Sequence, residues 1–127
     1  MIVYVFGNAD LAMDSLPLQI LPELKKAFPA DSFSVKDPNE EWAIPEELVI
    51  IDTVVGLQSI KVFDDMKSFL ATPHVSMHDF DAYTNLMYLQ KLGKLKKIKI
   101  IGVPPMILPE KALEEVSGIL TSLASRS

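Results

Sequence analysis

The chain has 127 residues, a length typical of one domain, and 49% of them are hydrophobic, enough for a substantial core. It contains no cysteine, which excludes a disulfide framework, a thiolate metal site and a cysteine nucleophile. The net charge of -5 argues against nucleic acid as a partner, because phosphate binding needs a basic surface. No apolar run approaches the roughly 18 residues that cross a bilayer, so we expect no membrane partner and a single domain over residues 1–127.

The first two predicted elements are a strand over residues 2–6 and a helix from about Ser15 to Phe28. The N-terminus lacks a basic region and a cleavage site, so it is interpreted as a buried strand rather than a signal peptide. In the helix, Pro17 suits the first turn, whereas Pro22 is expected to cause a kink. The helix is predicted from apolar residues at helical spacing, namely Leu16, Ile20, Leu24 and Phe28.

The middle of the chain is predicted to contain the central strand. A short strand over residues 33–35 is followed by an acidic loop over residues 37–47. The continuous apolar run at residues 48–51 is typical of a strand buried on both faces, as in a parallel sheet, and it ends at Asp52. Residues 60–63 are predicted to return as a short antiparallel strand.

The last third of the chain is predicted to supply a helix, a strand and a closing helix. Residues 64–78 are polar and are expected to be irregular, and a helix over residues 79–92 is stopped by Gly93. Residues 97–103 are predicted to form a buried strand, and apolar spacing over residues 113–123 predicts a closing amphipathic helix. This alternation predicts the α/β class: a three-layer α/β/α sandwich with a mainly parallel, partly mixed sheet.

Three polar residues follow predicted strands or precede a predicted helix. Asp14 comes after the first strand, Asp52 comes directly after the central strand, and His78 lies just before the helix that starts near residue 79. Ligands in open α/β sheets bind beyond the carboxyl ends of the strands, so these side chains are expected to converge. Two carboxylates and one imidazole suit a divalent metal and leave positions open for water or substrate, as metal-assisted hydrolysis requires.

Each of these residues also has a structural interpretation. Asp14, taken alone, is more typical of an N-cap for the helix beginning near Ser15. Asp52 follows four buried aliphatic residues and must find a partner or water, which fits structural capping as well as function. His78 fits a surface or capping histidine, and His74 is a competing imidazole in a similar Thr-x-His setting.

Taken in order, four segments resemble the motifs of one known family. They are residues 5–8 with Leu11 and Asp14, residues 50–53 with Gly56, residues 76–78 before an amphipathic helix, and residues 100–105. This ordered set is similar to that of the hydrogenase maturation endopeptidases. One departure is the stretch Met13–Pro17, which lacks the glycines that many members carry around the first ligand, so this loop is expected to be stiffer.

The resemblance implies a cytoplasmic endopeptidase with an α/β/α sandwich fold. Such enzymes remove a short C-terminal extension from the large-subunit precursor of a nickel-iron hydrogenase after nickel has been loaded. It also implies that Asp14, Asp52 and His78 are the catalytic residues and transient nickel ligands. The nickel is then carried by the substrate, and no organic cofactor is expected.

Two further hypotheses fit the same sequence. One is a non-catalytic binding or assembly protein of the same fold, which would hold a metalloprotein precursor without cutting it. The other is a flavodoxin-like module that binds a small ligand at the Gly7-Asn8 loop. A flavin or nucleotide bound to the purified protein, detected by absorbance, would favour the module.

Overall fold

The structure is a computed structural model that describes residues 1–37, 40, 42–71 and 77–125. Its centre is a five-stranded sheet in the order β2-β1-β3-β5-β4. All neighbouring pairs are parallel except β4, which runs antiparallel to β5, so the predicted mixed sheet is confirmed. The strands are β1 (Ile2–Val5), β2 (Ser32–Val35), β3 (Glu47–Thr53), β4 (Lys61–Phe63) and β5 (Lys97–Val103).

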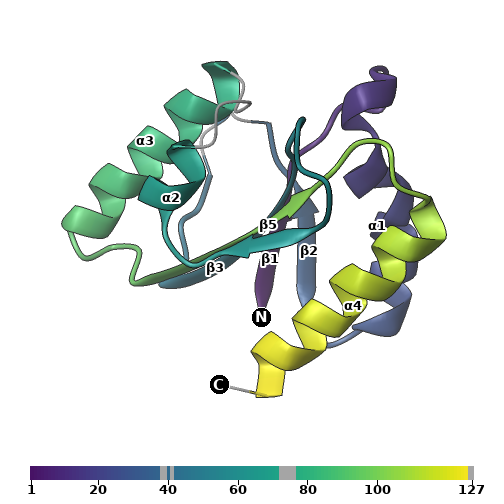
Figure 1. Ribbon diagram of the computed structural model, residues 1–127. Helices are drawn as coiled ribbons and strands as arrows, with labels where there is room; N and C mark the ends of the chain where they lie inside the picture. The colour runs from purple at the N-terminus through teal and green to yellow at the C-terminus, as the bar shows by residue number, and fades with distance from the viewer. Residues whose placement is uncertain (38–39, 41, 72–76, 126–127) are drawn as a thin grey trace.

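The helices cover both faces of this sheet. They are a 3₁₀ turn, η1 (Ala12–Asp14), and the α-helices α1 (Leu16–Ala27), α2 (Met66–Leu70), α3 (Met77–Lys91) and α4 (Pro109–Ser125). Figure 1 shows α1 and α4 on one face and α2 and α3 on the other. The predicted three-layer α/β/α sandwich is therefore confirmed. None of the helices among the described residues is long and apolar enough to cross a membrane.

The segment 64–78, predicted to be irregular, contains all of α2 and the start of α3. Asp65 caps α2, because its carboxylate accepts hydrogen bonds from the Ser68 backbone N–H at 2.7 Å and the Ser68 hydroxyl at 3.0 Å. These bonds hold the pKa of Asp65 below its usual value. On the other side of α2, Met66 and Phe69 are buried. A helix of five residues is too short to show a periodic pattern, so capping and packing stabilise it without a sequence signal.

The helix α1 continues through Pro22 as a single element. Its buried stripe extends to both sides of the proline, with Ile20 before it and Leu24 after it. Packing of this stripe against the sheet offsets the backbone hydrogen bond that proline removes. The predicted boundaries of this helix agree with the structure to within about one residue at each end.

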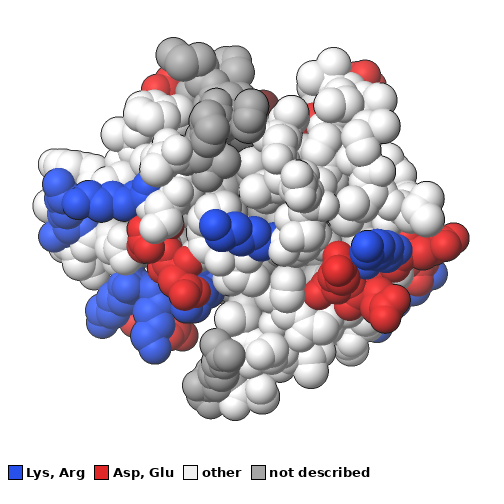
Figure 2. Space-filling view, viewed as in Figure 1, with Lys and Arg blue, Asp and Glu red and all other residues white. Residues whose placement is uncertain are grey.

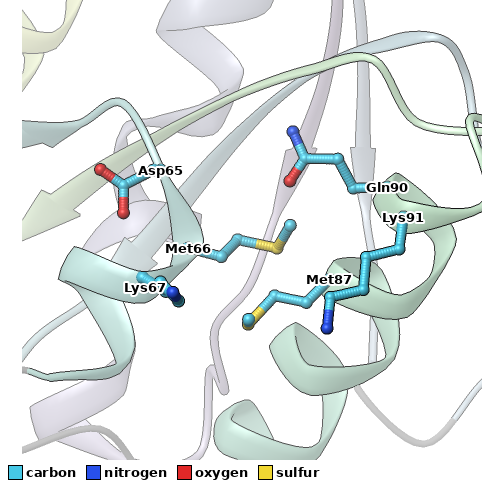
Figure 3. A pocket seen from close by; sticks show the side chains of 6 residues that line it. All are labelled: Asp65, Met66, Lys67, Met87, Gln90 and Lys91. Atoms are coloured by element: carbon cyan, nitrogen blue, oxygen red, sulfur yellow. The ribbon is translucent and has the colours of Figure 1, made fainter.

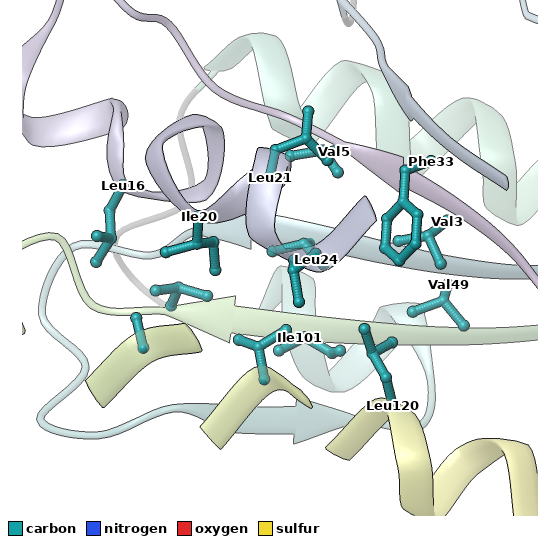
Figure 4. Close-up of a cluster of buried hydrophobic side chains, with 14 residues drawn as sticks. Val3, Val5, Leu16, Ile20, Leu21, Leu24, Phe33, Val49, Ile101 and Leu120 are labelled. Carbon is teal, nitrogen blue, oxygen red and sulfur yellow. The ribbon is translucent and has the colours of Figure 1, made fainter. Parts of the chain in front are cut away.

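Two apolar clusters fill the space on the two sides of the sheet. Figure 4 shows the cluster between the sheet and the helices α1 and α4, to which β3 contributes Val49 and Ile51. The second cluster lies under α2 and α3, and β3 contributes Leu48 and Ile50 to it. The prediction of a central strand buried on both faces is thus confirmed.

Candidate functional site

The carboxyl ends of β1, β3 and β5 meet at one edge of the sheet. The strands are parallel and paired in register, with Val5 opposite Ile51 and Asp52 opposite Gly102. Figure 1 shows η1 and the first turn of α3 at this same end of the molecule, at the top of the view. The structure thus brings the segments that carry Asp14, Asp52 and His78 to one edge, the place where ligands bind in open α/β sheets.

Asp14 lies at the end of η1 and is half-buried. The loop before it is closed by backbone hydrogen bonds: the Asn8 N–H donates to the Asp14 carbonyl at 2.8 Å, and the Asp14 N–H donates to the Leu11 carbonyl at 2.9 Å. The Asn8 side chain also accepts from the Asp10 N–H at 2.9 Å, which makes a local Asx turn. The residue in the N-cap position of α1 is Ser15, so the interpretation of Asp14 as that N-cap is wrong.

Gly7 allows η1 to approach the end of β1. A Cβ atom at this position would lie 3.0 Å from the Asp14 carbonyl oxygen and 3.0 Å from the Leu18 Cγ. Both distances are shorter than ordinary van der Waals contact, and the first partner is backbone, which cannot rotate away. The absence of a side chain at Gly7 is therefore what lets the loop that carries Asp14 close against the strand.

Asp52 is buried, with only 1% of its surface exposed. It follows Ile50 in the alternation of β3 and points toward α3, where the Tyr83 hydroxyl donates to its Oδ2 at 3.1 Å. Its partner in the register, Gly102, is closely packed: a Cβ there would lie 3.0 Å from Leu57 Cδ1 and 3.2 Å from a ring carbon of Phe63. Asp52 is thus a carboxylate inside the protein, and one partner that stabilises it there is the hydroxyl of a tyrosine on the facing helix.

Tyr83 is the residue at this site that the sequence interpretation missed, because it was counted only as part of the apolar stripe of the helix. One property of the sequence could have indicated a role for Tyr83. A buried tyrosine almost always needs a hydrogen-bond partner for its hydroxyl, and Asp52 was a buried carboxylate in need of a donor. Neither residue identifies the other in the sequence, since they are 31 positions apart.

His78 is the second residue of α3, one residue further into the helix than Met77. Its side chain, and the whole of His74, lie outside the described residues. By helix geometry the His78 backbone is five residues, or about 7.5 Å along the axis, from Tyr83. The part of the chain that the structure describes contains no group of three or more side chains able to hold a metal, so the convergence of Asp14, Asp52 and His78 stays a prediction.

The loops that follow β1, β3 and β5 at this edge have apolar, polar and acidic side chains, and the basic residues beside them are Lys36, directly after β2, and Lys61, which pairs with Gly102. Residues 7–15, 54–60 and 104–108 contain no Lys or Arg. Figure 2 shows the same face as Figure 1, with its Lys and Arg side chains away from the upper end. The exposed large apolar side chains in these loops are Leu11, Met13, Val55, Met106 and Leu108. These three loops therefore favour an uncharged or basic partner over an acidic one.

A shallow pocket lies elsewhere, between α2 and the last turns of α3. Figure 3 shows Met66 and Met87 pointing toward one another across it, with Lys67 and Lys91 at its rim. These last turns are at the opposite end of α3 from His78. The pocket is therefore separate from the edge where Asp14 and Asp52 lie.

No protein-family model and no curated protein matches the sequence. The structure is similar to three solved hydrolase structures over most of each chain. The first is the hydrogenase maturating endopeptidase HybD from E. coli, with a TM-score of 0.65 and 20% identity over 95% of this chain and 92% of that one. The second is a hydrogenase 3 maturation protease, with a TM-score of 0.66 and 18% identity over 91% and 86% of the two chains. The third is an endopeptidase from Escherichia coli, with a TM-score of 0.60 and 18% identity over 91% and 90%.

The protein is thus an α/β/α sandwich with one antiparallel edge strand and with polar residues at the carboxyl edge of the sheet. This is the fold of the solved hydrogenase maturation endopeptidases, as the resemblance in the sequence implied. At these identities the likeness establishes the fold.

Proposed function

We propose that the protein is an endopeptidase that removes the C-terminal extension from the nickel-loaded large-subunit precursor of a nickel-iron hydrogenase. The observation that carries the proposal is Asp52, a buried carboxylate at the carboxyl end of the central strand, held by a hydrogen bond from Tyr83. The fold shared with solved maturation endopeptidases supports it. We also propose a cytoplasmic location, where such a precursor would be assembled.

In this proposal Asp14, Asp52 and His78 are the ligands that meet the nickel of the precursor. Two oxygen ligands and one nitrogen ligand suit a divalent ion and leave coordination positions for the peptide. The nickel is cargo of the substrate, so the protein needs no resident metal. Two routes lead to cleavage: polarisation of the peptide carbonyl by the metal, or attack by a water that a carboxylate activates as general base.

The second candidate is a non-catalytic binding or assembly protein that holds the same kind of precursor. The exposed apolar side chains around the edge, such as Leu11 and Met106, favour it, because they offer a docking surface whether or not cleavage follows. The flavodoxin-like module is less well supported. The sheet of a flavodoxin-like fold has the strand order 2-1-3-4-5. The sheet of this protein has the order 2-1-3-5-4, with β4 antiparallel to β5 at the edge.

The proposed activity predicts that cleavage depends on nickel in the precursor. The protein is incubated with a candidate large-subunit precursor, either nickel-loaded or nickel-free. The masses of the products are measured by mass spectrometry. We expect loss of the C-terminal tail only in the loaded sample, because the metal is the recognition element. Stable binding without cleavage in both samples would instead favour the assembly protein, and cleavage independent of nickel would contradict the role of the metal.

The packing at Gly7 predicts the effect of Gly7→Ala on processing. The added methyl group displaces the Asp14 carbonyl and with it η1, so we expect the cleavage rate to fall about 10- to 100-fold. The matched control is Gly118→Ala in α4, where a Cβ meets nothing within 4 Å. We expect it to leave processing unchanged and to stabilise the helix by about 0.5–1 kcal/mol in thermal unfolding. Equal processing by both variants would show that the position of η1 is unimportant.

A further inference from the structure

The hydrogen bond between Tyr83 and Asp52 connects two elements of the proposed site. The Tyr83 hydroxyl donates to Asp52 Oδ2 at 3.1 Å, and 0% of Tyr83 and 1% of Asp52 are exposed. Two neighbouring rings hold the tyrosine ring in place: the ring centroid of Phe69 is 4.6 Å away and that of Phe6 is 5.8 Å away. The donor is therefore fixed by packing and has little freedom to leave the carboxylate.

The bond also links α3 to β3. Asp52 lies at the carboxyl end of β3, and Tyr83 lies five residues after His78 on α3. A shift of α3 along its axis by one residue, about 1.5 Å, would break a bond of this length. The bond thus fixes the position of α3 along its own axis, and with it the position of the first turn of α3 relative to the strand that carries Asp52.

We propose that Tyr83 is a positioning residue: its hydroxyl orients the Asp52 carboxylate for the metal and sets the position of the helix that carries His78. This inference rests on the proposed function. Ligating carboxylates are usually held by outer hydrogen bonds of this kind, and loss of such a partner typically weakens metal affinity or activity about 10- to 100-fold.

A purely structural role gives a different expectation. If the hydroxyl only satisfies a buried carboxylate, its removal lowers stability and leaves the affinity of the folded protein for metal unchanged. If it positions Asp52, its removal weakens metal binding at temperatures where the protein is fully folded. Metal affinity measured well below the unfolding midpoint separates the two roles.

The test compares Tyr83→Phe with a matched control, Tyr4→Phe. Tyr4 belongs to the same apolar cluster, and its hydroxyl donates to the Ala43 carbonyl, so this control also removes one hydroxyl hydrogen bond from under α2 and α3. Binding of Ni²⁺ alone is measured by titration calorimetry on the full chain, with thermal unfolding recorded for each variant. We expect Tyr83→Phe to weaken Ni²⁺ binding about 10- to 100-fold and to lower the cleavage rate of the nickel-loaded precursor by a similar factor. Tyr4→Phe is expected to leave both unchanged.

Asp52→Asn, measured in the same way, separates failure of this inference from failure of the proposed function. If Asp52→Asn loses Ni²⁺ binding and cleavage while Tyr83→Phe matches the unsubstituted protein, Tyr83 is structural and the site stands. If Tyr83→Phe and Tyr4→Phe lose affinity equally, the effect is not specific to the site and the positioning role is overturned. If Asp52→Asn binds and cleaves normally, the metal site itself is wrong, and the role of Tyr83 falls with it.

Discussion

Asp52→Asn is expected to lower processing of a nickel-loaded precursor at least about 100-fold while leaving the fold intact. Asparagine has the same shape as aspartate, and its carbonyl oxygen can still accept the Tyr83 hydrogen bond, so the packing under α3 is retained. What is lost is the negative charge that would meet the metal. The rate is measured by mass spectrometry of the released tail, and the fold is checked by circular dichroism and the unfolding midpoint.

Ala variants of the other two proposed ligands, Asp14 and His78, are expected to lose processing in the same assay. The control is Asp10→Asn, which removes an exposed charge from the loop that carries Asp14 and is expected to leave the rate within about twofold. Normal processing by all three ligand variants would show that the site assignment is wrong. Loss of processing by the Asp10 variant as well would point to the charge of the loop rather than to individual ligands.

Ile50→Ala is expected to lower the free energy of unfolding by about 2–5 kcal/mol. Ile50 lies on the central strand with 0% of its surface exposed, in the cluster between the sheet and the helices α2 and α3. Truncation leaves a cavity that the surrounding sheet cannot fill, because its neighbours are held by the strand pairing on both sides. The loss is a large part of the roughly 5–15 kcal/mol that stabilises a typical domain, and it is measured by urea unfolding.

Two further variants show how the loss of unfolding free energy depends on the size and the burial of the group that is removed. Ile50→Val removes one methylene and is expected to cost about 0.5–1.5 kcal/mol. Val35→Ala, on an edge strand with 51% of the valine exposed, is expected to change the free energy by no more than about 0.5 kcal/mol. If Ile50→Ala cost no more than Val35→Ala, the cluster under α3 would not be a packed core.

The strands and long helices could be predicted because each carries its own signal. The run at residues 48–51 is uninterrupted and aliphatic because both of its faces are covered, which is the condition in a central parallel strand. The predicted strand at 97–103 matches β5 at both ends, and the stop at Gly93 agrees with its positive φ of 79°. The antiparallel return at 60–63 is also confirmed, one residue shorter than predicted.

The parts that sequence could not supply depend on contacts between distant segments. The five residues of α2 are stabilised by the Asp65 cap and by burial of Met66, neither of which produces a periodic pattern. For the candidate site, sequence order placed Asp14 and Asp52 at the carboxyl edge of the sheet, as the structure does, because strand ends define that edge. It could not find Tyr83, since a helical tyrosine looks like any other member of an apolar stripe until the facing strand is known.

Both edge strands of the sheet are short. The outer strands β2 and β4 have four and three residues, whereas the central β3 and β5 have seven each. Short edges present few unpaired backbone groups, which limits pairing with a second chain and so protects against edge-to-edge aggregation. The short length of the edge strands also restricts how an extended peptide can be bound. Adding a strand to β2 or β4 would give it few backbone hydrogen bonds, so a tail to be cut is better bound by its side chains and its metal, entering over the loops at the carboxyl edge.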